Sequence, residues 1–136
     1  MTQDDDRGLE RRKTISRYFA ALQAGDYPVL LEVLTPGALT RWPQSGERVT
    51  GAMSCVRIYE NYPGGPPQYR VERISGDGLV WVAEMTADYG TERWHVVSII
   101  EFEGQQIARM TDYFGPTFPA PDWRREWVEL EAPSGA

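Results

Sequence analysis

Cysteine, histidine and long apolar runs are nearly missing from this 136-residue sequence. The single cysteine, Cys55, cannot form a disulfide within the chain, which is typical of proteins in the reducing cytoplasm. One histidine and one cysteine are too few for the three or four ligands of a His/Cys metal site. No stretch approaches the roughly 20 apolar residues of a membrane-spanning helix. We therefore expect a cytoplasmic protein with no metal and no membrane association.

Positive charge is also scarce. The chain has 14 Lys and Arg residues against 20 Asp and Glu residues, for a net charge of −6. Nucleic-acid-binding domains neutralise phosphates with clustered basic side chains, and no such cluster occurs here. Residues 1–13 are charged and lack the apolar stretch of a secretion signal. We expect neither nucleic-acid binding nor secretion.

The first half of the chain has the apolar spacing of helices. Between residues 9 and 26, four apolar side chains recur at offsets of 0, 3, 4 and 7. These are Ile15, Tyr18, Phe19 and Leu22. Such a stripe predicts an amphipathic helix with one buried face. Gly25 is expected to end this helix, and Asp26 to cap a second helix over residues 27–34.

A third helix is predicted within residues 51–63. Its inward face would carry Ala52, Cys55, Val56, Tyr59 and Tyr62. The sequence PGGPP ends this helix firmly, because proline and glycine interrupt helical backbone. Residues 38–51, between the second and third helices, predict a strand, a glycine-bearing turn and a return strand.

The rest of the chain is predicted to be β-structure. Four strand-like segments, residues 68–75, 79–89, 93–102 and 106–114, are separated by the glycine-bearing junctions GDG, GTE and EGQ. We expect an antiparallel meander, and hence one α+β domain in which three helices precede a curved, cone-shaped sheet. This domain spans residues 1–136, with its core at about 9–115 and a C-terminal extension with a short helix at 116–136.

Strand alternation predicts which side chains face inward. Charged residues mark the outer face of each strand, for example Glu84, Glu101 and Arg109. The opposite parity places a second set inside: Trp81, Met85, Trp94, Ser98, Met110, Asp112 and Phe114. Asp112 is therefore expected to be a carboxylate among apolar neighbours, with a pKa raised by desolvation. The alternative is an exposed strand-end aspartate that caps a loop or pairs with an arginine.

The outer face of the same strands is also apolar. Val80, Val82, Val97 and Ile99 share the outer parity with His95. A sheet face of this kind is too apolar to be solvated. The simplest partner is a second copy of the chain, so we expect a homodimer formed through the outer sheet face.

At this point the sequence resembles the nuclear transport factor 2-like superfamily, which includes SnoaL-like polyketide cyclases, ketosteroid isomerases and limonene-epoxide hydrolases. The segment ISRYFAALQAGD resembles the first helix of that superfamily, and GQQIARMTDYFG resembles its last strand. Together they bracket roughly residues 9–115. The resemblance implies a cone-shaped α+β fold, but it does not imply one activity, because this fold hosts unrelated chemistries.

The resemblance carries over to particular residues only in part. Tyr18 corresponds to the oxyanion-binding tyrosine of ketosteroid isomerases. Trp42 and Ser98 stand where those enzymes have carboxylates, so steroid isomerisation is not expected. Asp112 matches the last-strand aspartate of the epoxide hydrolases and resembles the acid–base aspartate of the polyketide cyclases.

Epoxide hydrolases also need an arginine and an aspartate two residues apart on a middle strand. Met85 and Ala87 occupy those places here, so the resemblance implies no water-activating triad.

Three functional classes remain open. The first is a cofactor-free lyase, cyclase or isomerase, with Asp112 as acid–base group and Tyr18 as oxyanion donor, acting on a hydrophobic, ring-containing molecule. The second is a non-catalytic binder of such a molecule, and the third is an assembly protein with a vestigial pocket. The expected ligand-binding residues are Trp42, Tyr59, Trp81, Met85, Trp94, Ser98, Met110 and Phe114. Trp123 and Trp127 are expected to pack over the mouth of the cone or onto a partner.

Overall fold

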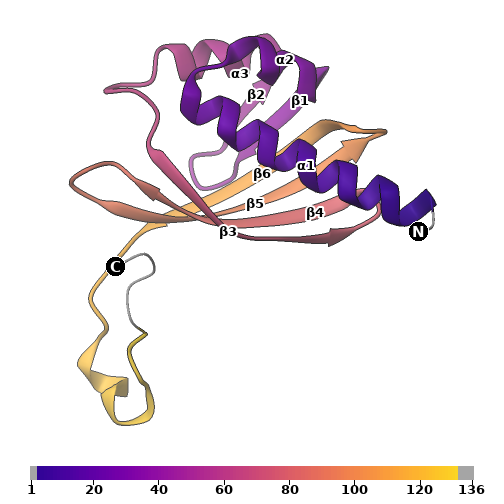
Figure 1. The fold of residues 1–136 in the computed structure, drawn as a ribbon. Helices are drawn as coiled ribbons and strands as arrows, with labels where there is room; N and C mark the ends of the chain where they lie inside the picture. The colour runs from indigo at the N-terminus through magenta and orange to yellow at the C-terminus, as the bar shows by residue number, and fades with distance from the viewer. Residues whose placement is uncertain (1–2, 132–136) are drawn as a thin grey trace.

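The structure is a computed structural model that describes residues 3–131 (Figure 1). Two helices come first, a two-strand hairpin and a third helix follow, and four further strands complete the chain before its last short helix. The elements are α1 (Gln3–Ala24), α2 (Tyr27–Val33), β1 (Leu34–Trp42), β2 (Glu47–Thr50), α3 (Ala52–Glu60), β3 (Gln68–Asp77), β4 (Val80–Asp88), β5 (Arg93–Glu103), β6 (Gln106–Pro116) and the 3₁₀ helix η1 (Asp122–Trp127). The predicted α+β class, with three helices packed against a curved sheet, is confirmed, although β1 and β2 of that sheet precede α3.

The sheet has six strands in the order β2-β1-β6-β5-β4-β3. Strands β3 to β6 form the predicted antiparallel meander. Strand β1 then pairs in parallel with β6, so that the β1–β2 hairpin extends the sheet beyond its last strand. Register shifts in three strand pairs interrupt the ladders. Such bulges bend strands, and here they accompany the curvature of the sheet.

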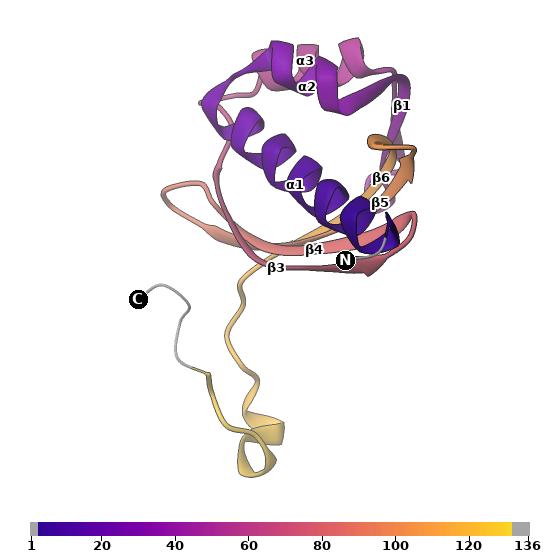
Figure 2. The ribbon, with the colours of Figure 1, turned by 45° about the vertical axis from the view of Figure 1, so that its right-hand side comes forward.

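Helix α1 lies across the concave face of the sheet (Figures 1 and 2). The predicted stripe of Ile15, Tyr18, Phe19 and Leu22 is buried, which confirms the face that periodicity assigned. Gly25 follows α1 with a φ of 69°, a left-handed conformation that suits glycine at a helix end. Asp26 occupies the N-cap position of α2, but its side chain makes no capping hydrogen bond, so the expectation of a side-chain cap is wrong.

One end of the cone is closed by Arg11 of α1. Its guanidinium donates hydrogen bonds to the carbonyl oxygens of Gly104 (3.0 Å) and Gly78 (2.8 Å), which belong to two different hairpin turns. The same group lies over the ring of Phe102. Arg11 thus ties the helix to both turns, and the cavity described below lies toward the other end.

The outer sheet face is exposed in this single chain. Val80 and Val97 are 51% and 37% exposed, and Tyr113 is exposed beside them. His95, also of outer parity, is exposed and lies 3.3 Å from the hydroxyl of Thr117. The face is therefore apolar, as expected, while its covering by a second copy stays a prediction. Among the described residues, no helix is both long and apolar enough to cross a membrane.

Gly76 offers a test of the close packing between the end of β3 and the start of β4. A Cβ at this position would lie 2.6 Å from the carbonyl oxygen of Val80 and 2.7 Å from Cα of Trp81, which are backbone atoms. Gly76→Ala is therefore expected to destabilise the fold by about 1–3 kcal/mol, as overpacking does. Urea unfolding measures the change. Gly115→Ala is the matched control, because its Cβ would meet nothing within 4 Å; equal losses in both variants would contradict this packing.

Candidate functional site

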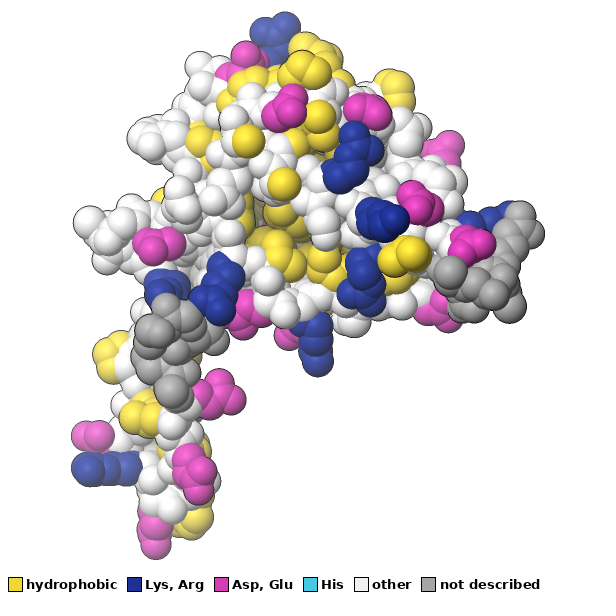
Figure 3. Space-filling model, in the orientation of Figure 1, with side chains coloured by type: hydrophobic (Ala, Val, Ile, Leu, Met, Phe, Trp, Pro, Cys, Tyr) yellow, Lys and Arg dark blue, Asp and Glu magenta, His cyan; other side chains and the backbone are white. Residues whose placement is uncertain are grey.

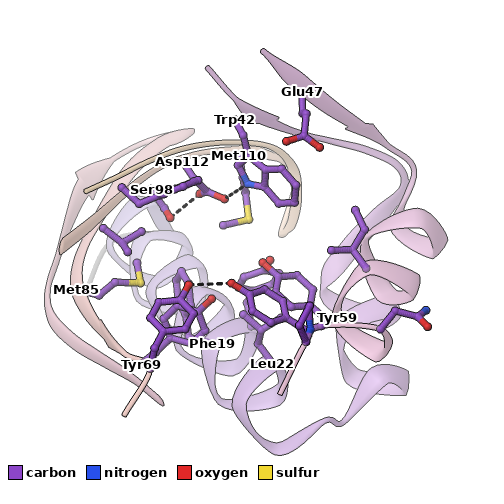
Figure 4. Close-up of a pocket in the computed structure, with 18 residues that line it drawn as sticks. Phe19, Leu22, Trp42, Glu47, Tyr59, Tyr69, Met85, Ser98, Met110 and Asp112 are labelled. Carbon is purple, nitrogen blue, oxygen red and sulfur yellow. Dashed lines mark hydrogen bonds between the residues drawn. The ribbon is translucent and has the colours of Figure 1, made fainter. Parts of the chain in front are cut away.

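A cavity of about 480 Å³ lies between the concave sheet face and the helices (Figure 4). Its lining is dominated by aromatic and other apolar side chains. The lining residues are Tyr18, Phe19, Leu22, Trp42, Glu47, Ile58, Tyr59, Asn61, Tyr62, Pro63, Tyr69, Met85, Tyr89, Val96, Ser98, Met110, Asp112 and Phe114. Hydrophobic side chains are also visible in the hollow between helices and sheet in Figure 3. Cavities of this size and character hold small molecules.

Asp112 lies in the wall of this cavity and is only 8% exposed. Its Oδ1 accepts a hydrogen bond of 2.6 Å from Oγ of Ser98, its register partner on β5. Its Oδ2 accepts a hydrogen bond of 3.0 Å from Nε1 of Trp42 on β1. The carboxylate therefore faces inward, and the alternative of an exposed cap or an arginine pair does not occur.

Two opposing effects act on the pKa of Asp112. Burial raises it, since removal from water penalises the charged carboxylate. The hydrogen bonds from Ser98 and Trp42 lower it, because both donors stabilise the charged form. Burial is the larger effect, so the pKa is raised from its ordinary value. A carboxyl group with a raised pKa is suited to proton exchange closer to neutral pH.

Tyrosine hydroxyls face this carboxylate across the cavity. Tyr18 comes from α1, Tyr59 from α3 and Tyr69 from β3, and Figure 4 shows Tyr59 and Tyr69 on the side opposite Asp112. Burial raises the pKa of all three well above the usual tyrosine value, and nearby ionisable groups, Asp112 included, raise it further. These hydroxyls consequently stay protonated and can donate hydrogen bonds to a ligand oxygen.

Cys55 lies next to Tyr18 beneath the cavity. Burial raises the pKa of its thiol to about 11, while a hydrogen bond with Tyr18 lowers it. The thiol is therefore protonated at neutral pH and is a poor nucleophile. This agrees with the buried, helix-face position expected for it.

Aromatic rings continue from the cavity to its rim. Tyr59 stacks on Tyr62, and Tyr62 on Tyr89, with ring centroids 6.0 and 6.4 Å apart. The hydroxyls of Tyr62 and Tyr89 lie 2.8 Å apart in a hydrogen bond that joins the end of α3 to the end of β4. Trp94 packs edge-on against Tyr89 and tilted against Phe114. The rim is thus a run of rings that favours planar apolar molecules.

The structure brings most of the predicted site residues together. Besides Asp112 and Tyr18, six of them line the cavity: Trp42, Tyr59, Met85, Ser98, Met110 and Phe114. Their roles in binding or catalysis stay predictions.

Trp81 and Trp94 do not line this cavity. Trp81 is buried at the closed end, where its Nε1 donates to the carbonyl of Gly78 and Arg12 lies over its ring. Trp94 lies at the outer edge of the rim, where its Nε1 donates to Glu92. The prediction that Trp81 and Trp94 lie in the cavity wall is wrong. The alternation of side chains along a strand shows which face of the sheet a residue is on, but not how far along the cone it lies.

Ten of the 18 lining residues were absent from the predicted site, and three of them, Tyr69, Glu47 and Tyr89, show why. Tyr69 pairs with the inward Ala87, and Glu47 pairs with Trp42, so each shares a face with a residue already assigned inside. Tyr89 has inward parity but lies beyond the end of β4. Strand register would have identified Tyr69 and Glu47, and the sequence alone does not give that register.

The lining contains Asp112 and Glu47 but no Lys, Arg or His. Within the described part of the chain, no group of three His, Cys, Asp or Glu side chains is placed to hold a metal ion. Phosphate groups would find no cationic partner in this cavity. What the arrangement offers instead is one buried carboxyl group, several hydroxyl donors and a large apolar surface.

Comparison with known proteins identifies the family and the fold. A family model for the SnoaL-like domain matches residues 15–110. The chain belongs to this family. No curated protein matches the sequence.

Several solved structures are similar to this chain in fold. An NTF-2 like protein of unknown function from Burkholderia xenovorans is 32% identical, with a TM-score of 0.84 over 93% of this chain and 98% of that one. A proposed ketosteroid isomerase from Kribbella flavida is 24% identical, with a TM-score of 0.82 over 93% of each chain. An LEH-like epoxide hydrolase from M. tuberculosis is 21% identical, with a TM-score of 0.67 over 79% of this chain and 84% of that one.

Trp42→Phe tests the electrostatic account of Asp112. The wild type should lose stability relative to Asp112→Asn as pH rises from about 3.9, the usual Asp pKa, through the raised folded pKa, because ionisation is disfavoured in the folded state. Removing the Trp42 donor should raise the folded pKa of Asp112 further, so the loss of stability should continue to higher pH. Each further pKa unit should lower the free energy of unfolding by about 1.4 kcal/mol at pH values above the folded pKa. Urea unfolding between pH 4 and 8 measures both effects.

Trp94→Phe is the matched control, because its indole N–H bonds Glu92 and not Asp112. It should leave the pH profile of the wild type unchanged. A profile for Trp42→Phe that coincides with that of Trp94→Phe would contradict the role of Trp42.

Proposed function

We propose that this SnoaL-like protein binds a hydrophobic, ring-containing molecule in the cavity and that Asp112 exchanges a proton with it. The activity would be that of a cofactor-free lyase, cyclase or isomerase. The observation that carries the proposal is the single buried carboxyl group in the wall of an otherwise aromatic cavity, opposite protonated tyrosines. Buried carboxylates are costly, and they are concentrated at functional sites.

The chemistry follows from the placement of these groups. Asp112 would take the proton from a carbon next to a carbonyl, and the electron pair of that C–H bond would move to the carbonyl oxygen as an enolate. Tyr18 or Tyr59 would donate a hydrogen bond to that oxygen. The enolate would then accept the proton at another carbon or attack a second carbonyl. A positioned base contributes about 10²–10⁴-fold, and one oxyanion donor about 10²–10³-fold.

Epoxide hydrolysis is not supported. The arginine and aspartate that such enzymes use are replaced by Met85 and Ala87, both buried. Ser98, which stands in place of a ketosteroid-isomerase carboxyl group, donates its hydrogen bond to Asp112. The likeness to the epoxide hydrolase and to the proposed ketosteroid isomerase is thus one of fold.

A non-catalytic binder is the second candidate. Both oxygens of Asp112 already accept a hydrogen bond, from Ser98 and from Trp42. Such a fixed carboxylate can serve as an acceptor for a ligand hydroxyl without any proton transfer. The two candidates share the ligand class and differ in whether the ligand exchanges a proton.

The ligand class is tested by a thermal-shift screen. Hydroxylated anthraquinones, steroid enones and monoterpene ketones should raise the melting temperature, because the lining is apolar and aromatic. Nucleotides and sugar phosphates should not, because no cationic side chain lines the cavity. Stabilisation by the phosphorylated compounds alone would overturn the assigned class.

Proton exchange is tested with a ketone found in that screen. In deuterium oxide, the wild type should speed the exchange of hydrogen next to the carbonyl by about 10²-fold or more over buffer, as a positioned base does. Asp112→Asn should bind the ketone and lose this exchange, because Ser98 can reverse its hydrogen bond to the amide while the amide cannot accept the proton. Proton NMR follows the loss of signal.

Ser54→Ala, an exposed change on α3, is the control and should exchange like the wild type. Equal exchange by Asp112→Asn and the wild type would contradict catalysis by Asp112. Binding without exchange in either protein would favour the non-catalytic candidate.

A further inference from the structure

Residues 117–131 form a C-terminal arm that leaves the sheet after β6 and extends away from the domain (Figures 1 and 2). Its large apolar side chains are exposed: Phe118, Trp123, Trp127, Val128 and Leu130. Trp123 and Trp127 are 73% and 75% exposed, and no residue of η1 is buried. The two tryptophans therefore do not cover the mouth of the cone. Of the two expected arrangements, only packing onto a partner remains.

Exposure of so many large apolar side chains to water is energetically unfavourable for an isolated chain. A buried tryptophan removes about 150–250 Å² of surface from water, so two exposed ones forgo a large hydrophobic stabilisation. The arm also curls around a hollow of about 410 Å³, which is lined by residues between Ala120 and Leu130. Exposed apolar patches of this kind mark sites of association.

The same chain carries a second unpartnered apolar surface, the outer sheet face. Its exposed members include Val80, Val97 and Tyr113. Figures 1 and 2 show that the arm projects to this side of the sheet, while the helices cover the other side. Two copies whose outer faces meet would thus bring each arm beside the other copy.

We propose that the arm of one copy packs on the outer sheet face of a second copy, in a reciprocal dimer. The exchange buries Trp123 and Trp127 of each arm together with the exposed valines of the opposite sheet. A two-fold arrangement uses both surfaces twice and leaves neither unpaired, as closed dimers do.

A membrane surface is a poorer occupant for the arm. Segments that lie on membranes are rich in Lys and Arg, which attract anionic lipids. The arm has four acidic residues and two arginines, and the whole chain has a net charge of −6. Charge therefore favours a protein surface.

The arm is also shared with related structures. Residues 1–116 make up about 85% of the 136-residue chain, so alignments that cover 93% of it must extend into the arm. Both partners in these alignments are crystal structures. The alignments with these two structures therefore include part of the arm.

Light scattering on the full chain at micromolar concentration tests the proposal. The wild type should show twice the chain mass of 15.5 kDa. Trp123→Ser with Trp127→Ser should weaken dimerisation by about 30-fold or more, the loss expected for central interface tryptophans. Val80→Ser with Val97→Ser should also weaken it. Leu31→Ser with Met53→Ser, which changes exposed apolar residues on α2 and α3, should leave the mass unchanged.

Mixing the arm variant with the sheet variant shows whether the two surfaces meet. A native arm from one variant then finds a native sheet face on the other, so the mixture should dimerise better than either variant alone. A monomeric wild type, whether its arm is free or folded back on its own sheet, would overturn the proposal. So would a dimer that survives the arm substitutions, or a mixture that associates no better than its components.

Discussion

The burial of one carboxyl group is the constraint on which this structure depends. Asp112 lies in an aromatic cavity, where an unpaired charge would be prohibitively costly. Ser98 and Trp42 offset part of that cost with one hydrogen bond to each oxygen. The result is a carboxyl group that the fold can hold but whose charged form is disfavoured. This is the property on which we base the proposal that Asp112 exchanges a proton with a ligand of the cavity.

Three strands must meet to hold Asp112 in this way. Its neighbour Ser98 comes from the antiparallel partner β5, while Trp42 comes from β1, which runs parallel to β6 on the other side. The β1–β6 pairing is therefore as important to the site as Asp112 itself. Arg11 ties α1 to two hairpin turns at the far end of the cone, away from the aromatic end that contains the cavity. The exposed outer face and arm belong to a different task, which we assign to assembly.

The sequence predicts much of this arrangement and fails at definable points. Alternation around Arg109 and Glu101 placed Asp112 and Ser98 inside, because charged side chains rarely occupy an inner face. Periodicity likewise placed Tyr18 on the buried face of α1. Local patterns carry this information, since each depends only on the period of its own helix or strand.

Properties that depend on distant residues were not predicted. Nothing in the sequence of β1 shows that it pairs in parallel with β6, so the contact between Trp42 and Asp112 could not be foreseen. Trp81 and Trp94 have the right parity but lie beyond the two ends of the cavity. Tyr69 was missed because its face follows from register with β4. The short helix of the arm was expected, but its projection away from the domain was not.

The most direct test of the central claim is a titration of the Asp112 carboxyl carbon by NMR. Comparison with Asp112→Asn would assign the signal. The account predicts a pKa above about 3.9, the usual value for aspartate, because burial outweighs the two hydrogen bonds. A pKa below that value would show that the charged form is favoured, and it would contradict a role for Asp112 as the proton-exchanging group of the cavity.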